Sequence, residues 1–265
     1  MSGLYALAVI AAALACPLIG EEPPPTGGDH EFEELGVNRY TTPSIARIFN
    51  QLDQLKPIPF DQLKRDFPQP AGASREQKGL MFGELIANGF LLVEAEKKNL
   101  IEDFGRVLMQ QARALGVGDQ VMRHSASLTE LGRRGEWPRM RQELITTQTD
   151  VEQAMVELRD EKMAHLISLG GWLRGLEISA ASVELDFSPQ RAKILAQPDL
   201  VDYFASELQT LPPALVHSPL FEKLRSGIAA LGPLLKKSPT ELTRADVTAI
   251  RAQANELNQA IRQGG

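Results

Sequence analysis

The chain has 265 residues, enough to bury a substantial core, and 34 acidic against 28 basic residues give it a net charge of −6. This balance argues against nucleic acid as the main partner, because phosphate binding needs a basic face. Aromatic residues make up only 6% of the chain, and no segment alternates in the way that strands require. Good helix formers dominate instead, so the composition predicts an all-α fold.

Residues 1–15 predict a signal peptide. Leu4 to Ala15 is an uncharged apolar run, shorter than the roughly 20 residues of a membrane span. It ends in Ala13-Leu14-Ala15-Cys16, which resembles a bacterial lipobox, and the resemblance implies that Cys16 carries a lipid. Ala13 and Ala15 also suit ordinary signal peptidase cleavage, which would give simple secretion. An uncleaved anchor is the third alternative.

Residues 16–38 predict a flexible tether between the lipid and a folded domain. Cys16 is the single cysteine of the chain, and an exported protein seldom keeps a lone thiol without a use for it. The residues that follow, Pro17 to Gly36, are rich in proline and glycine, as linkers are. We therefore expect export to the periplasmic or cell-surface face of a bacterial membrane, with residues 39–265 as the α-helical domain.

The first half of this domain predicts one short and one long helix. Thr42-Pro43 begins a helix that ends before Pro57, and Phe60 to Phe67 allow one or two further turns. Ser74, with Gln77 three residues later, has the pattern of a capping box. The apolar spacing that follows predicts a helix as far as Leu115, about 60 Å long at 1.5 Å per residue.

A second long helix is predicted over residues 136–183, either continuous or joined from two at Gly170-Gly171. Apolar residues, Leu158 among them, recur there at steps of three, four and seven, which indicates one buried stripe. Beside that stripe runs a row of small residues, which predicts the closest helix–helix crossing: Ser168, Gly171, Gly175, Ser179 and Ser182. Two helices of such length predict an elongated bundle built on a long antiparallel pair.

Shorter helices complete the predicted bundle. Residues 119–131 form one between the two long helices. Beyond Val183, prolines divide the chain into short helices that begin near Ser188, Ser218 and Thr243. One continuous bundle is the favoured organisation, with a sub-boundary near Asp186 as the alternative.

The sequence holds no recognisable catalytic, metal-binding or cofactor-binding motif. Phosphate loops, Cys-x-x-Cys pairs, His-Glu-x-x-His and esterase elbows are all absent, so we expect no catalytic residue, metal or cofactor. The candidate ligand or interaction residues are Glu161, His165 and Trp172. Glu161 and His165 share a helix face at four-residue spacing, and His165 lies seven residues before Trp172. A packed structural histidine is the simpler interpretation, since one histidine and one carboxylate are too few for a firm metal site.

These observations predict an exported, lipid-anchored, non-enzymatic helical binding or scaffold protein of the bacterial cell envelope. Its partner is an unknown envelope protein or ligand, and its membrane contact is the lipid on Cys16. The alternative is a small-ligand sensor or carrier module with a pocket between the long helices. A broad exposed apolar patch would favour the first function, and a pocket lined by several polar side chains would favour the second.

Overall fold

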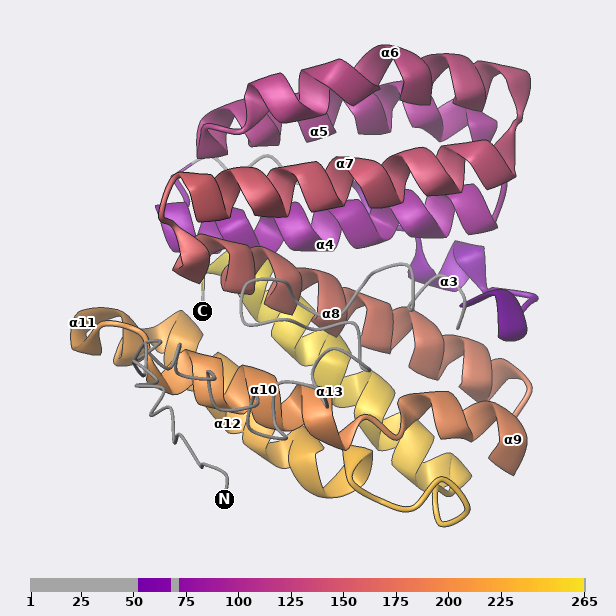
Figure 1. The fold of residues 1–265 in the computed structure, drawn as a ribbon. Helices are drawn as coiled ribbons and strands as arrows, with labels where there is room; N and C mark the ends of the chain where they lie inside the picture. The colour runs from indigo at the N-terminus through magenta and orange to yellow at the C-terminus, as the bar shows by residue number, and fades with distance from the viewer. Residues whose placement is uncertain (1–51, 68–71, 265) are drawn as a thin grey trace, which may run out of the picture.

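The computed structural model describes residues 52–67 and 72–264. Within these ranges the chain forms eleven α-helices, labelled α3 to α13, and two short 3-10 helices, with no strand (Figure 1). The predicted all-α class is therefore confirmed. None of the helices in this part of the chain combines the length and the apolar character of a membrane span. The predicted signal peptide and tether lie outside the described residues.

Four consecutive helices form a bundle in the N-terminal half. They are α4 (Arg75–Glu94), α5 (Ile101–Leu115), α6 (Gly118–Arg134) and α7 (Trp137–Glu157), and each contacts the next. In Figure 1, α5 and α6 lie above α4 and α7, and contacts between α7 and α4 close the ring. The short helix α3 (Phe60–Leu63) lies beside this bundle.

Helix ends follow several of the predicted signals. The Ser74 hydroxyl accepts the Gln77 backbone N–H at 3.1 Å and so caps α4. The side chain of Gln77 does not complete the capping box, because it donates to the Ile261 carbonyl of α13 at 2.8 Å. Gly116 ends α5 in the left-handed region, with a φ of 85°, as expected of a C-cap glycine.

The predicted helix from Ser74 to Leu115 is two helices. α4 ends at Glu94, and the 3-10 helix η1 (Lys98–Leu100) separates it from α5. The break is a Schellman motif, in which the Glu96 N–H bonds to the Val93 carbonyl at 3.1 Å and the Lys97 N–H to the Leu92 carbonyl at 2.9 Å. Glu96 adopts a φ of 54°, a conformation that is usually left to glycine.

The predicted helix over residues 136–183 also divides, but not at Gly170-Gly171. α7 ends at Glu157 and α8 (Glu161–Leu185) begins after an Asp160 N-cap. Arg159 takes the left-handed conformation, with a φ of 55°, and the Asp160 N–H bonds to the Met155 carbonyl at 2.8 Å. Leu158, predicted in the buried stripe, is therefore 59% exposed in the connection. The glycine pair lies within an unbroken α8.

α8 is the central helix, because its side chains enter two hydrophobic cores. Ile167, Ile178 and Ala181 pack with the four-helix bundle, whereas Leu169, Leu173 and Leu176 pack with the C-terminal helices. α8 is therefore buried on nearly every side from Met163 to Val183, and the predicted single apolar stripe does not describe it.

The backbones of α8 and α4 are in close contact. A Cβ atom added to Gly83 would lie 1.7 Å from the Ile167 carbonyl oxygen and 2.7 Å from the Gly171 nitrogen. One added to Gly170 would lie 2.0 Å from the Leu80 carbonyl oxygen. The glycines thus allow backbone-to-backbone packing, at Gly171 of the predicted row of small residues and at its neighbour Gly170.

α4 and α8 run in the same direction, unlike the predicted antiparallel pair of long helices. Gly79 faces Met163, Gly83 faces Ile167, and Asn88 contacts Arg174, so contacts advance along both helices together. Four reversals of the chain separate the two helices, one before each of α5, α6, α7 and α8, and this even number gives α8 the direction of α4 (Figure 1).

The C-terminal half packs on the other side of α8 (Figure 1). Its longer helices are α10 (Pro198–Gln209), α12 (Pro219–Leu235) and α13 (Arg244–Gln263). Its short helices are α9 (Pro189–Ala192), η2 (Lys193–Leu195) and α11 (Pro213–Val216). Prolines occupy the first positions of four of these helices, as the sequence predicts at Pro189 and Pro219.

Candidate functional site

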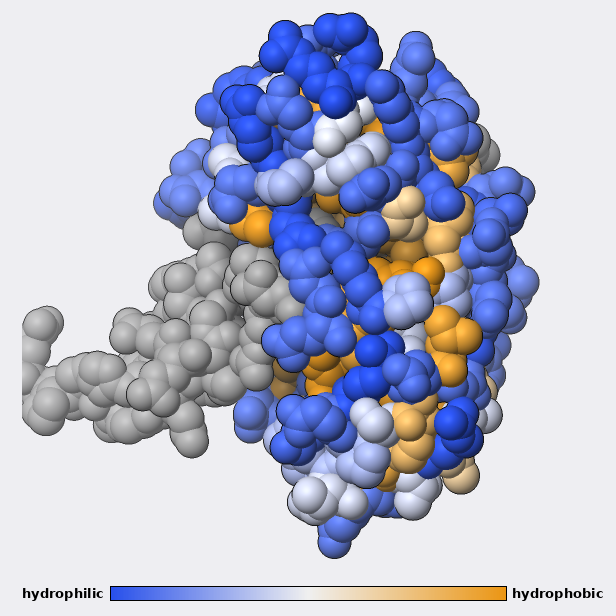
Figure 2. Space-filling model, turned by 90° about the vertical axis from the view of Figure 1, so that its right-hand side faces the viewer, coloured by the Kyte–Doolittle hydropathy of each residue, from blue (hydrophilic) through white to orange (hydrophobic). Residues whose placement is uncertain are grey.

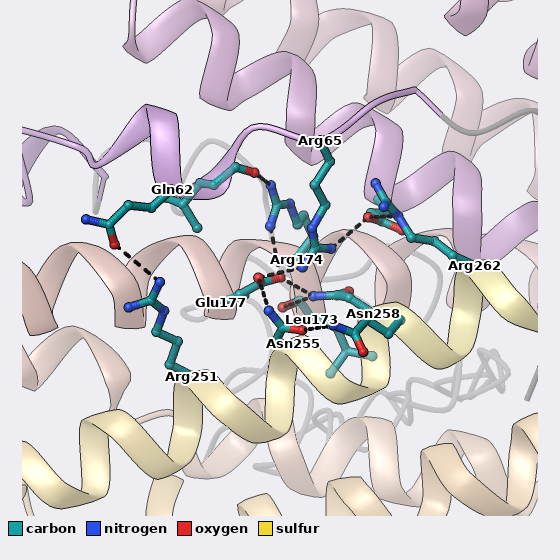
Figure 3. A network of polar contacts seen from close by, with 12 residues as sticks. Gln62, Arg65, Leu173, Arg174, Glu177, Arg251, Asn255, Asn258 and Arg262 are labelled. Carbon is teal, nitrogen blue, oxygen red and sulfur yellow. Dashed lines mark hydrogen bonds and ion pairs between the residues drawn. The ribbon is translucent and has the colours of Figure 1, made fainter.

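An arginine–glutamate cluster lies where α4, α8 and α13 meet (Figure 3). Its centre is Arg174 of α8, which is 0% exposed. The Arg174 guanidinium donates to Asn88 Oδ1 and to Glu177 Oε2, each at 2.9 Å, and also to the Leu63 carbonyl. Burial lowers the pKa of the Arg174 side chain, and the nearby Glu177 carboxylate opposes that effect.

Two further arginines belong to this cluster. Arg65 donates to Glu84 Oε1 at 3.0 Å and to Glu177 Oε1 at 2.5 Å. Arg262, near the end of α13, donates to Glu84 Oε1 at 2.9 Å. The cluster is thus defined as Arg65, Glu84, Arg174, Glu177 and Arg262. Three cations and two anions leave it with a formal charge of +1.

Glu177 accepts donors from three parts of the chain. Besides Arg65 and Arg174, Asn255 donates to its Oε1 at 3.2 Å and Asn258 to its Oε2 at 2.8 Å. Both asparagines lie on α13, as Figure 3 shows. A buried carboxylate needs such compensation, since an uncompensated charge in a protein interior is very costly.

A pocket of about 670 Å³ opens beside the cluster, lined by α4, α5, the end of α13 and residues at or just after α3. This volume lies within the roughly 300–1,000 Å³ range of small-molecule sites. The apolar part of its wall consists of Phe60, Phe67, Leu91, Leu92, Leu100 and Val107. The polar part consists of Lys64, Arg65, Asp66, Asn88, Asp103, Arg106 and Arg262. Arg65 and Arg262 thus belong both to the cluster and to the pocket wall.

The predicted pair of Glu161 and His165 is not a direct contact pair. His165 Nδ1 hydrogen-bonds the Tyr203 hydroxyl of α10, and His165 Nε2 lies 3.5 Å from Glu207 Oε2 of the same helix. Glu161 is exposed at the start of α8. Burial lowers the pKa of His165, and the carboxylates of Glu207 and Glu161 oppose that effect.

Trp172 lies further along α8 and makes separate contacts. Its indole N–H donates to Gln197 Oε1 at 2.8 Å, and its ring stacks on Phe204 with centroids 4.9 Å apart. Trp172 is 3% exposed, so its ring is part of the core. The cavity beside His165 has a volume of only about 10 Å³, too small for a ligand larger than a water molecule.

Metal binding at His165 can be tested by melting. Zinc, copper or iron is expected to leave the melting temperature of the protein unchanged, because His165 Nδ1 is already bonded to Tyr203 and His165 Nε2 lies beside Glu207. In the part of the chain that the structure describes, no group of three or more histidine, cysteine, aspartate or glutamate side chains is arranged to hold a metal. A ligand that prefers the folded state must raise the midpoint. A metal-induced rise that disappears in His165→Gln would contradict this expectation.

Sequence reasoning missed the arginine–glutamate cluster, although a signal for it is present. Arg174 and Glu177 are the charged residues in the most apolar stretch of α8, and they stand three residues apart. Glu84 and Asn88 stand four residues apart in the apolar part of α4. Charged side chains within a helix that is apolar on all sides indicate a buried pair.

Comparisons with known proteins give no information on function, so a function can be proposed only from the structure. No family model matches the chain, and neither the curated proteins nor the solved structures give a match.

Proposed function

We propose that this protein binds a small ligand in the pocket formed by α3, α4, α5 and α13. The observation that carries the proposal is the joint presence of an apolar wall and seven polar or charged side chains around about 670 Å³ of open space. Ligand sites in proteins combine these two features, with apolar groups supplying contact area and a few polar groups fixing orientation. The sensor or carrier function is therefore preferred.

A scaffold function receives less support from the surface. Among the described residues, the exposed large hydrophobic side chains are Met122 on α6, Leu158 between α7 and α8, and Leu185 at the end of α8. On the face drawn in Figure 2, apolar areas are interrupted by polar side chains. A protein-docking surface would need a larger continuous apolar patch.

Filling the pocket tests the ligand-binding function. Leu100 lines the pocket and is partly exposed, so the indole of Leu100→Trp has room to extend into it. The matched control is Leu185→Trp, because Leu185 is 51% exposed at the end of α8 and does not line the pocket. Each protein is incubated with a metabolite and lipid extract and repurified, and bound compounds are identified by mass spectrometry.

Wild type and Leu185→Trp are expected to retain the same compound, and Leu100→Trp is expected to lose it. Retention by all three proteins would place the binding elsewhere, and no retained compound in any of them would reject the proposal. Circular dichroism must first show that both variants keep the helical fold.

Export and lipid attachment remain part of the proposal, in line with the lipobox resemblance at Cys16 and the proline-rich segment behind it. The variant Cys16→Ala is expected to keep the folded domain and to leave the membrane fraction. Salt-washed membranes that still hold Cys16→Ala, or a wild-type protein without lipid by mass spectrometry, would contradict lipidation.

A further inference from the structure

We infer that the pocket selects an amphipathic anion, a molecule with one negative head group and a hydrocarbon portion. This inference rests on the proposed ligand-binding function and specifies its ligand class. Two features of the wall carry it: the sign of its charge and the separation of its charged and apolar parts.

The pocket wall is positive although the chain is negative. The lining contains the cations Lys64, Arg65, Arg106 and Arg262 and the anions Asp66 and Asp103, and together with Glu84, Arg174 and Glu177 of the cluster, five cations and four anions give a formal charge of +1. The whole chain carries −6. A concave surface with a local charge opposite to that of the protein concentrates ligands of the complementary sign, here anions.

The cluster supplies a fixed position for the head group. Arg65 and Arg262 are held by Glu84, and Arg65 also by Glu177, so both guanidinium groups are oriented before a ligand arrives. Each guanidinium has five N–H donors, and the contacts within the described residues use two donors of Arg65 and two of Arg262. Further donors therefore remain for a carboxylate or phosphate oxygen, and the +1 charge of the cluster favours an anion there.

The hydrocarbon portion has a matching apolar wall. Phe60, Leu91, Leu92 and Val107 line the same pocket and are buried or nearly so. Lys97 places its ammonium 4.7 Å from the centre of the Phe60 ring, which holds that ring at the edge of the pocket. Phe67 and Leu100 also line the pocket and are partly exposed, so their side chains are accessible to a hydrocarbon chain.

Calorimetric titration with four probes tests the ligand class. The probes are decanoate, decanol, decyltrimethylammonium and acetate, which vary the head group on one chain or remove the chain. Decanoate is expected to bind at least about tenfold more tightly than decanol, the factor that a 1.4 kcal/mol charge-assisted contact provides. Decyltrimethylammonium and acetate are expected to bind more weakly than decanoate. Equal or tighter binding of decanol or of the cation would overturn the inference.

Two exposed residues on the rim allow opposite charge changes without disturbing the cluster. Arg106 and Asp103 pair with each other at 3.1 Å, and their side chains are 63% and 65% exposed. Asp103→Asn is expected to tighten decanoate binding about two- to fivefold and Arg106→Gln to weaken it by a similar factor, as fits exposed charges. The control variants Asp119→Asn and Arg133→Gln make the same charge changes on α6, outside the pocket wall, and are expected to leave the affinity unchanged.

The head-group position is tested at Arg262, which contributes from the pocket wall and is partly exposed. Arg262→Gln is expected to weaken decanoate binding by at least about tenfold, and Arg262→Lys by less, because it keeps the charge. Decanol binding is expected to be unchanged in both variants, which separates loss of the head-group contact from loss of the fold. Unchanged decanoate affinity in Arg262→Gln would overturn this position for the head group.

The outcomes of these experiments also distinguish a failure of the anion preference from a failure of the proposed ligand-binding function. If decanol binds as well as decanoate and Leu100→Trp blocks both, the pocket binds ligands and the anion preference is wrong. If decanoate binds Leu100→Trp and wild type equally, the pocket is not the site and both conclusions fail. If none of the four probes binds, the anion inference is overturned, and the extract experiment alone decides the ligand-binding function.

Discussion

Replacing Gly83 with alanine is expected to destabilise the protein by about 3 kcal/mol or more, at or above the upper end for overpacking. The new Cβ would lie 1.7 Å from the Ile167 carbonyl oxygen, a backbone atom that cannot rotate away. α4 and α8 would have to separate, and both hydrophobic cores contain side chains of these two helices. Urea denaturation followed by circular dichroism measures the change in the free energy of unfolding.

Gly105→Ala is the matched control for Gly83→Ala. Gly105 lies inside α5, and a Cβ added there would have no atom within 4 Å. Alanine is a better helix former than glycine, so this variant is expected to gain up to about 1 kcal/mol. Equal stability of Gly83→Ala and wild type would show that the α4–α8 crossing is looser than described.

The variant Glu177→Gln is expected to cost about 3–5 kcal/mol, the range for breaking a buried ion pair from one side. Its amide nitrogen would replace one carboxylate oxygen and face two donors, either Arg65 and Asn255 at the Oε1 position or Arg174 and Asn258 at the Oε2 position. The positive charge of Arg174, which is 0% exposed, would lose the carboxylate that it contacts directly. The same denaturation measurement applies.

Glu184→Gln is the control, because Glu184 lies on the same helix and pairs with Arg251 at 2.5 Å but is 23% exposed. Its loss is expected to cost less than about 1 kcal/mol. The double variant Arg174→Met/Glu177→Gln is expected to recover part of the lost stability, since it removes the uncompensated cation. A cost below about 1 kcal/mol for Glu177→Gln would show that the cluster contributes little to the fold.

The sequence predicts the helices of this protein better than their ends. Apolar spacing identifies the buried faces of α5 and α7, and the caps at Ser74 and Gly116 lie where expected, but α4 and α8 are buried on nearly every side. The two missed breaks depend on left-handed residues, Glu96 and Arg159, that are not glycine. At both breaks, carbonyl groups in the last turn of the helix accept Schellman hydrogen bonds from N–H groups just beyond it. The types of residue at these positions do not predict such bonds.

The candidate site was less predictable, because it is made from distant parts of the chain. Arg65, Glu84, Arg174 and Arg262 stand on four different elements or segments, and no local spacing links them. The sequence instead favoured Glu161 and His165, whose spacing is local. His165 instead contacts two residues of α10, and the spacing within one helix cannot predict a contact with another helix. Its ligand role, like that of Trp172, remains a prediction.

The pocket wall is complete only after α13 has been synthesised, because Arg262 lies on that helix. Arg262 contacts the Asp66 carbonyl across 196 residues at 3.3 Å, and both residues line the pocket. α3 to α5 are therefore synthesised long before their last wall residue emerges. Until α13 has docked against α8, the early helices can pack with each other but cannot present the complete set of arginines. A chain that stops before Arg262 would lack one arginine of the pocket wall, and it is expected to bind the proposed ligand less tightly than the full chain.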